Sequence, residues 1–532
     1  MPSTAKTVYA IHGNRMGAMP ESQLEQPRRR AVGTSPTLGV WFAVLAALGA
    51  GLGLRIYLLN QVFDVNGDSL VYGAIAKNLL LHGRYALTLA NGDIHETLIR
   101  LPGYPLFLAV LFRLFGMKNY YAAACVQIGL DLAGCLLLAG FALRAARAIR
   151  PGNEPFARRA ALITLGLAAL CPFTAAYAAL PLAEAPTLFS LALTMWAMAR
   201  FREQPGWASA LWFTLGVTWA ALLRPDGALA AAVFVPVMLL GLRGMSRRAT
   251  AGSPLRIALV CVLLAAAPFA AWTWRNWRVF HVFQPLAPRS AADPGEPTNP
   301  GWESWVKTWC LDFVSTYQVY WNVPGDKFDM NALPSRAFDS PQQYAATAAL
   351  ARAYNSQGMQ LTPQLDAGFA ALARERIAAN PLRSHLWLPL GRLADMWLRP
   401  RVQILPIDLD WWNYRRHHTE TVFSWAYAGL NLAYLLLAAV GLWLRPRYWQ
   451  ALLAYILLRS ALLLTIQAPE TRYTIECFPM LLALGGIAVA AGFRNSAPRP
   501  GACESGRPRE SRPRAAASLS AHGIDPPDYR FT

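Results

Sequence analysis

Residues 38–87 read LGVWFAVLAALGAGLGLRIYLLNQVFDVNGDSLVYGAIAKNLLLHGRYAL, an apolar run followed closely by two aspartates, Asp64 and Asp68. A helix crosses a bilayer with about 20 predominantly apolar residues. The run over 38–60 meets that length, so it predicts a transmembrane helix that ends just before the carboxylates. The orientation of the other spans then decides which side of the membrane Asp64 and Asp68 face.

The same length criterion, applied to the whole chain, predicts about ten transmembrane helices. They cover residues 38–60, 120–143, 160–179, 181–200, 207–223, 226–242, 256–274, 421–444, 449–467 and 474–492. The composition agrees, because 55% of the 532 residues are hydrophobic and only 15% are charged, whereas soluble domains have about 25% charged residues. The predicted fold class is an all-α polytopic membrane protein.

Basic residues set the predicted orientation. The chain has 49 Lys and Arg against 30 Asp and Glu, and the cations gather in the tails and in short loops. With the N-terminus inside, loops 144–159 and 445–449 and the C-terminal tail all fall in the cytoplasm, as the positive-inside rule requires. Residues 102–116 are apolar but only about 15 residues long, so they are predicted to lie at the outer interface rather than to span. This topology accounts for the positive charge, and no nucleic-acid partner is expected.

The topology divides the chain into domains. They are a cytoplasmic N-terminal tail (1–37), a transmembrane module (38–274) with an outer loop (61–119), an outer or periplasmic domain (275–420), C-terminal transmembrane helices (421–492) and a disordered cytoplasmic tail (493–532). The outer domain precedes the last three spans and is predicted to be mostly helical. Within it, LDAGFAALARERIAANP has the pattern of an amphipathic helix that ends at Asn380 and Pro381.

Asp68 has two interpretations. The apolar residues after it, among them Leu70, Val71, Ala74 and Ile75, follow the spacing of an amphipathic helix lying on the bilayer. At the start of that helix, Asp68 can be an N-cap that satisfies free backbone amides. Alternatively, it is a carboxylate held at the lipid–water boundary to take a proton from an incoming nucleophile.

Several sequence elements between residues 38 and 492 resemble the GT-C superfamily of integral-membrane glycosyltransferases, within it the group related to protein O-mannosyltransferases and the lipid A aminoarabinose transferase. The elements are Asp68, Tyr72 and Ala76 followed by NLLLHG and an LPGYP turn; LPLAEAPTLF, with Glu184; WTWRNWRVFHVFQP, with Arg275; and APETRYTIECFPMLL, with Glu470, Arg472 and Tyr473. Many relatives carry adjacent Asp-Glu in the first loop, whereas this chain has Asp68-Ser69. A second carboxylate, if one is needed, would therefore be Asp64 or Glu184.

The resemblance implies a GT-C-like enzyme in the inner membrane, with its active site on the periplasmic face and a polyprenyl-phosphate-sugar as donor. Arg100, Arg275 and Arg472 would bind the donor phosphate, since a guanidinium suits phosphate oxygens, although arginines near helix ends also reach water without any such role. Asp68 would act as general base in an inverting transfer while arginine stabilises the leaving phosphate.

The remaining site residues and partners also follow from the resemblance. Tyr72, Glu184, Glu470 and Tyr473 would line the pocket, although Tyr72 and Tyr473 also suit an interfacial aromatic belt. The implied partners are the donor, membrane lipid and an acceptor that is a lipid, a glycan or a protein. No cofactor is required, and a divalent cation stays open because some GT-C relatives use one and others do not.

Two further groups of residues have open interpretations. DLDWWNYRRHH, with Asp408, Asp410, His417 and His418, contains an Asp-x-Asp that resembles manganese-binding enzymes, but it is predicted to be the junction between the outer domain and the membrane. Asp131 lies within an apolar run, where a carboxylate is either functional or buried and hydrogen-bonded.

Two other functions compete with glycosyl transfer. A transporter or flippase for a lipid-linked sugar would show inverted repeats and broken helices with charges at mid-membrane, and the sequence shows no such half-to-half symmetry. A non-catalytic protein that binds a lipid-linked glycan is the other alternative. The sequence does not identify the sugar, the polyprenol or the acceptor.

Overall fold

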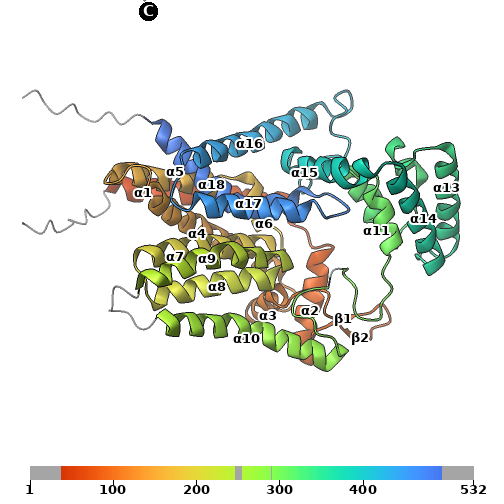
Figure 1. Ribbon diagram of the computed structural model, residues 1–532, viewed down its shortest axis with the longest axis horizontal. Coiled ribbons are helices and arrows are strands. Elements are labelled where there is room, and N and C mark those ends of the chain that lie inside the picture. The colour runs from red at the N-terminus through yellow and green to blue at the C-terminus, as the bar shows by residue number, and fades with distance from the viewer. Residues whose placement is uncertain (1–37, 246–253, 289, 494–532) are drawn as a thin grey trace, which may run out of the picture. The chain divides into compact units, whose positions relative to one another are not determined.

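The fold is almost wholly helical (Figure 1). The computed structural model describes residues 38–245, 254–288 and 290–493, so the two predicted tails lie outside it apart from Phe493. Among these residues the only sheet is a two-stranded antiparallel hairpin of β1 (Ala86–Thr88) and β2 (Ile94–Glu96), in which Ala86 lies opposite Glu96.

Most of the helices are joined by short connections, and the longer ones cover residues 83–102, 281–299 and 399–417. Up to residue 280 the helices are α1 (Leu38–Val62), α2 (Asp68–His82), α3 (Gly103–Phe115), α4 (Tyr120–Ala146), α5 (Glu154–Ala169), α6 (Pro172–Ala178), α7 (Glu184–Glu203), α8 (Trp207–Leu223), η1 (Pro225–Gly227), α9 (Ala228–Met245) and α10 (Pro254–Phe280). After residue 280 the helices are α11 (Pro300–Lys307), α12 (Phe313–Ser315), η2 (Thr316–Tyr320), η3 (Met330–Ala332), η4 (Ser335–Ala337), α13 (Pro341–Ser356), α14 (Pro363–Ala379), η5 (Arg383–Trp387), α15 (Leu388–Leu398), α16 (His418–Trp443), α17 (Trp449–Leu463), η6 (Thr471–Cys477) and α18 (Phe478–Gly492).

A helix lies at each place where the sequence predicts a span, but the predicted count of about ten spans is not confirmed. Five described helices are long and apolar enough to cross a membrane: Leu38–Val62, Tyr120–Ala146, Leu255–Phe280, His418–Trp443 and Thr471–Gly492. The pair α5 and α6 adds a sixth if it forms one span bent by 55°. Helices α8 and α17 are apolar but have only 17 and 15 residues. The chain is an integral membrane protein.

Two short helices, α2 and α3, lie between α1 and α4. Helix α2 begins at Asp68 and ends at Gly83, which adopts the left-handed conformation that glycine tolerates best. Helix α3 begins at Gly103, in the LPGYP turn. A Cβ atom on Gly103 would lie 2.6 Å from the backbone carbonyl of Leu222, so the absence of a side chain lets the start of α3 pack directly on the end of α8.

The segment after α10 has a hydrophobic core of its own. Trp302, Trp305 and Trp309 are almost fully buried there, together with Phe328 and Phe369. Figure 1 shows α14 beside α11 and α13, which enclose this core. Helix α14 ends at Ala379 with Asn380 as its C-cap, which confirms the amphipathic helix predicted over this stretch.

Candidate functional site

A cavity of about 610 Å³ lies where the segment between α1 and α4, the turn after α8 and the segment before α18 meet. Its polar lining is Asp68, Tyr72, Arg100, Arg224, Asp226, Arg472 and Tyr473. Its apolar lining includes Leu101, Leu223, Leu229, Ala287, Pro288, Ala291 and Leu462. A concave site with apolar walls and a few convergent charges is the usual form of a small-molecule pocket.

Asp68 lies between two guanidinium groups in this cavity. Its Oδ1 accepts a hydrogen bond of 2.6 Å from Nη2 of Arg100, and its Oδ2 lies 3.3 Å from Nη1 of Arg472. The N-cap of α2 is Gly67, and no side chain caps the helix. The capping interpretation of Asp68 is therefore wrong: the carboxylate joins segments that are distant in sequence.

Arg472 also pairs with Glu470, at 2.9 Å between its Nε and Oε2. Burial tends to raise the pKa of Asp68, but Arg472 and Arg100 outweigh it and hold that pKa below its ordinary value. Burial dominates at Glu470 and raises its pKa, with Arg472 opposing. Two carboxyls that share one arginine are thus shifted in opposite directions, and Asp68 is the one kept ionised.

A second cluster of charges joins two residues of the cavity lining, Arg224 and Asp226, to buried side chains behind them. Arg224 lies 2.8 Å from Glu184, 2.8 Å from Glu476 and 3.4 Å from Asp226. Arg459, whose side chain is fully buried, lies 2.5 Å from Asp226 and 2.9 Å from Glu476. Glu184, predicted as a pocket residue, therefore contacts Arg224 beneath the cavity instead of lining it.

Sequence reasoning missed four of these charges. Arg224 and Asp226 belong to LLRPDG, which separates two apolar runs. Two charges placed between apolar runs could have marked these residues as site candidates. Arg459 and Glu476 lie within predicted spans, where an ionisable residue is a functional candidate by default.

Two predicted site residues lie elsewhere. Asp64 is exposed, and its carboxylate accepts hydrogen bonds from the Val65 amide and from Asn66 in a local turn. Arg275 donates to the carbonyls of Thr97 and Tyr85, each at 2.7 Å, and pairs with Glu96. Neither residue lines the cavity. Arg275 instead holds the β1–β2 hairpin against α10, because its donors bind two backbone carbonyls and one carboxylate of the hairpin region.

The predicted tyrosines Tyr72 and Tyr473 both line the cavity. Tyr72 is one helical turn beyond Asp68, and its ring lies 5.9 Å from the guanidinium carbon of Arg100. Burial raises the pKa of Tyr72 to about 12, so its hydroxyl stays protonated at neutral pH. Tyr72 is therefore a hydrogen-bond donor beside the Asp68 carboxylate and not a second base.

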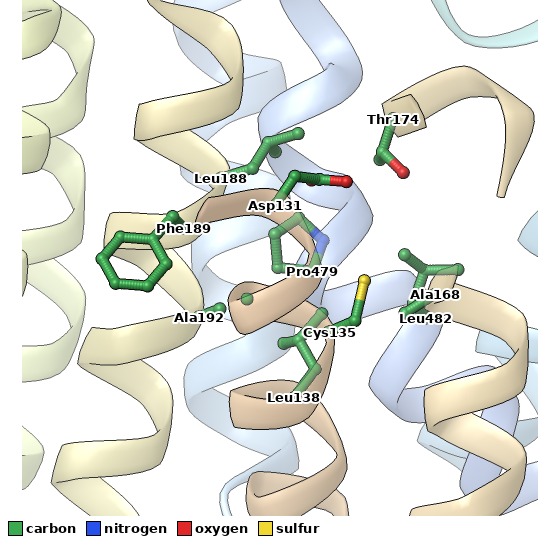
Figure 2. Close-up of a pocket in the computed structure, with 11 residues that line it drawn as sticks. Asp131, Cys135, Leu138, Ala168, Thr174, Leu188, Phe189, Ala192, Pro479 and Leu482 are labelled. Carbon is green, nitrogen blue, oxygen red and sulfur yellow. The ribbon is translucent and has the colours of Figure 1, made fainter. Parts of the chain in front are cut away.

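Asp131 is part of the helix packing rather than of this site. Its Oδ2 accepts hydrogen bonds of 2.8 and 2.5 Å from Arg55 on α1, which also donates to the carbonyl of Ala169. Figure 2 shows Asp131 and Cys135 beside a small cavity among α4, α7 and α18. That cavity has about 20 Å³, room for one water molecule. The buried, hydrogen-bonded interpretation of Asp131 is the one that the structure supports.

Two groups of side chains in the described residues have the spacing of metal ligands: His95 with Asp293 and Glu296, and Asp408 with Asp410 and His417. Asp293 is buried and accepts a hydrogen bond from the Leu98 amide at 2.7 Å. Neither group shares a residue with the lining of the 610 Å³ cavity.

No family model and no curated protein sequence matches the chain. An oligosaccharyltransferase from Archaeoglobus fulgidus, tethered to an acceptor peptide with the NVT sequon, is similar with a TM-score of 0.42 and 12% identity, over 86% of this chain and 50% of that one. A second structure from that organism, AglB with an inhibitory peptide and a dolichol-phosphate, is similar with a TM-score of 0.41 and 12% identity. The similarity covers 85% of this chain and 50% of AglB.

ArnT from Cupriavidus metallidurans, in its apo state, is similar with a TM-score of 0.35 and 16% identity, over 85% of this chain and 77% of that one. The chain is similar to these three structures with TM-scores of 0.35 to 0.42. It spans about half the length of the archaeal proteins.

Proposed function

We propose that the protein is a glycosyltransferase that moves a sugar from a polyprenyl-phosphate donor to an acceptor hydroxyl on the outer face of the inner membrane, with inversion. One observation carries this proposal: an ionised carboxylate, Asp68, lies between Arg100 and Arg472 in a cavity with apolar walls. Such a site offers an acceptor for a proton and donors for a phosphate within one pocket.

The donor's two ends match the two kinds of lining. The isoprenoid tail needs apolar surface, which Leu101, Leu223 and Leu462 provide. The phosphate needs donors that stabilise the charge that builds up as the sugar leaves. Arg100 and Arg472 meet this need because each holds Asp68 through one nitrogen and carries further N–H groups.

Binding of the donor would also activate the base. The pKa of Asp68 is low because Arg472 and Arg100 neutralise its charge, and a carboxylate with a low pKa is a weak base. A phosphate that draws these arginines toward itself would weaken both ion pairs and raise the pKa of Asp68. The base would then be strongest when the donor is bound, as inverting transfer by attack of an acceptor hydroxyl requires.

The direct test is sugar transfer by the purified protein from a synthetic polyprenyl-phosphate-sugar to a set of lipid, glycan and peptide acceptors. Product formation that Asp68→Asn abolishes supports an enzyme. Movement of the donor across a vesicle membrane with no transfer would favour a flippase, and tight donor binding with neither activity would favour a non-catalytic protein. Mass spectrometry of lipids that co-purify would identify the donor class.

Arg100→Gln is expected to raise KM for the donor by about 10- to 100-fold, because a charge-assisted hydrogen bond contributes about 1.5–3 kcal/mol. Arg275→Gln is the matched control. Its guanidinium is bound to Thr97, Tyr85 and Glu96, so it should lower thermal stability and leave KM within about threefold of wild type. Equal changes in KM for the two variants would argue against Arg100 as a phosphate ligand.

A further inference from the structure

A second group of charges surrounds one histidine at the start of α16. The side chain of His417 is only 9% exposed. Its Nε2 lies 3.0 Å from Oδ1 of Asp410, and its Nδ1 lies 3.4 Å from Oδ2 of Asp408 and 3.5 Å from Oε1 of Glu420. Glu420 is held in place because its Oε2 accepts a hydrogen bond of 2.9 Å from the Asp408 amide.

Both ring nitrogens of His417 therefore face carboxylates. A neutral imidazole has one N–H, so one of its nitrogens presents a lone pair. The buried Nε2 has no hydrogen-bond partner despite its short distance to Asp410. Asp410 therefore lies close to Nε2 without accepting a hydrogen bond from it, which leaves this buried nitrogen free to act as a ligand.

We propose that Nε2 of His417, Asp410 and Asp408 bind a divalent transition-metal ion, with Zn²⁺ as the best match to one imidazole and two carboxylates. One ligand atom from each of the three residues lies within 4.8 Å of the others. Ligand atoms that bind Zn²⁺ at 2.0–2.2 Å lie about 3.0–3.5 Å apart, and the 3.0 Å between Nε2 and Asp410 fits this range.

The surrounding residues fit a bound cation. Nδ1 of His417 faces the carboxylates of Asp408 and Glu420, and a carboxylate behind a ligating histidine fixes its tautomer. Three carboxylates lie around the ring, and Arg416 opposes them at 3.5 Å from the other oxygen of Asp410. The exposure of Asp408 and Asp410, 63% and 39%, leaves room for water to complete the coordination.

The ion would fix the segment that connects α15 to α16. Asp408 and Asp410 line a cavity of about 690 Å³ together with Arg399 and Gln403. Gln403 accepts a hydrogen bond from the Thr471 amide at 3.3 Å, beside Glu470 and Arg472. The ion would thus fix the connection between α15 and α16 at its end next to α16. Gln403, nearer to α15, contacts the segment that lines the 610 Å³ cavity.

The test uses the full-length protein in detergent, stripped with a chelator and titrated with Zn²⁺, with bound metal and Tm as readouts. Wild type is expected to bind one Zn²⁺ per chain at this site and to gain Tm. His417→Ala and Asp410→Asn should weaken that binding by at least about 10-fold, since even changes to residues behind the ligands cost that much. His418→Ala is the control, because this neighbouring histidine contacts only the Tyr414 ring among the aromatic side chains.

Equal Zn²⁺ affinity in wild type, His417→Ala and Asp410→Asn would overturn the proposal, as would an equal loss in His418→Ala. A Tm that responds to pH through His417 but not to Zn²⁺ would also overturn it, because the cluster would then hold an imidazolium. If His417→Ala does not fold, the nearly isosteric Asp410→Asn decides the question. Neither metal content nor Tm depends on sugar transfer, so the result is separate from that of the transferase assay.

Discussion

Asp68→Asn is expected to lower kcat for sugar transfer by about 100- to 10,000-fold, the usual contribution of a positioned general base. Asparagine has nearly the same size and can still accept a hydrogen bond from Arg100, but it cannot take the acceptor's proton. Because the two arginines hold the pKa of Asp68 below its ordinary value, wild-type kcat/KM should show no acid limb from this residue above about pH 4.

Asp64→Asn is the matched control, since Asp64 is exposed in the same loop and lies outside the cavity. Its kcat should stay within about twofold of wild type. Arg472→Gln gives a second check: it removes the largest influence that lowers the pKa of Asp68, so the acid limb should move to higher pH. Wild-type turnover in Asp68→Asn would exclude the proposed base.

Arg224→Gln is expected to cause the largest loss of stability. Arg224 is the common partner of Glu184, Glu476 and Asp226, and the side chains of Glu184 and Glu476 are 3% and 1% exposed. Removing one partner of a buried ion pair leaves an uncompensated charge, which costs about 3–5 kcal/mol. The measurement is the unfolding midpoint in detergent.

Arg84→Gln is the control for this loss. Arg84 pairs with Glu96 at 2.7 Å, but its side chain is 47% exposed, and exposed pairs contribute about 0–1 kcal/mol. Its midpoint should stay near that of wild type. Similar midpoints for the two variants would mean that the deep cluster does not stabilise the fold.

The positions of the helices could be predicted because a long apolar run in a bilayer must form a helix to satisfy its backbone hydrogen bonds. The run over 38–60 corresponds to α1, and Asn380 ends α14 as predicted. The number of spans stays a prediction, because α8 and α17 are apolar but have only 17 and 15 residues. The bend at Pro172 between α5 and α6 likewise depends on packing.

The site could be predicted where topology alone brings residues together. Asp68, Arg100 and Arg472 were expected on one side of the membrane, and the structure places them in one cavity. Arg275 shares that predicted side, but the hairpin carbonyls bind its donors. Arg459 and Glu476 come together only through the packing of α17 against η6, which no local pattern in either segment shows.

The ion pair of Arg55 and Asp131 constrains how α1 and α4 lie in the membrane. Arg55 belongs to the first long apolar helix and Asp131 to the second one long enough to span. Each charge alone is costly in lipid, so each of these two helices is more stable in the bilayer when the other lies beside it.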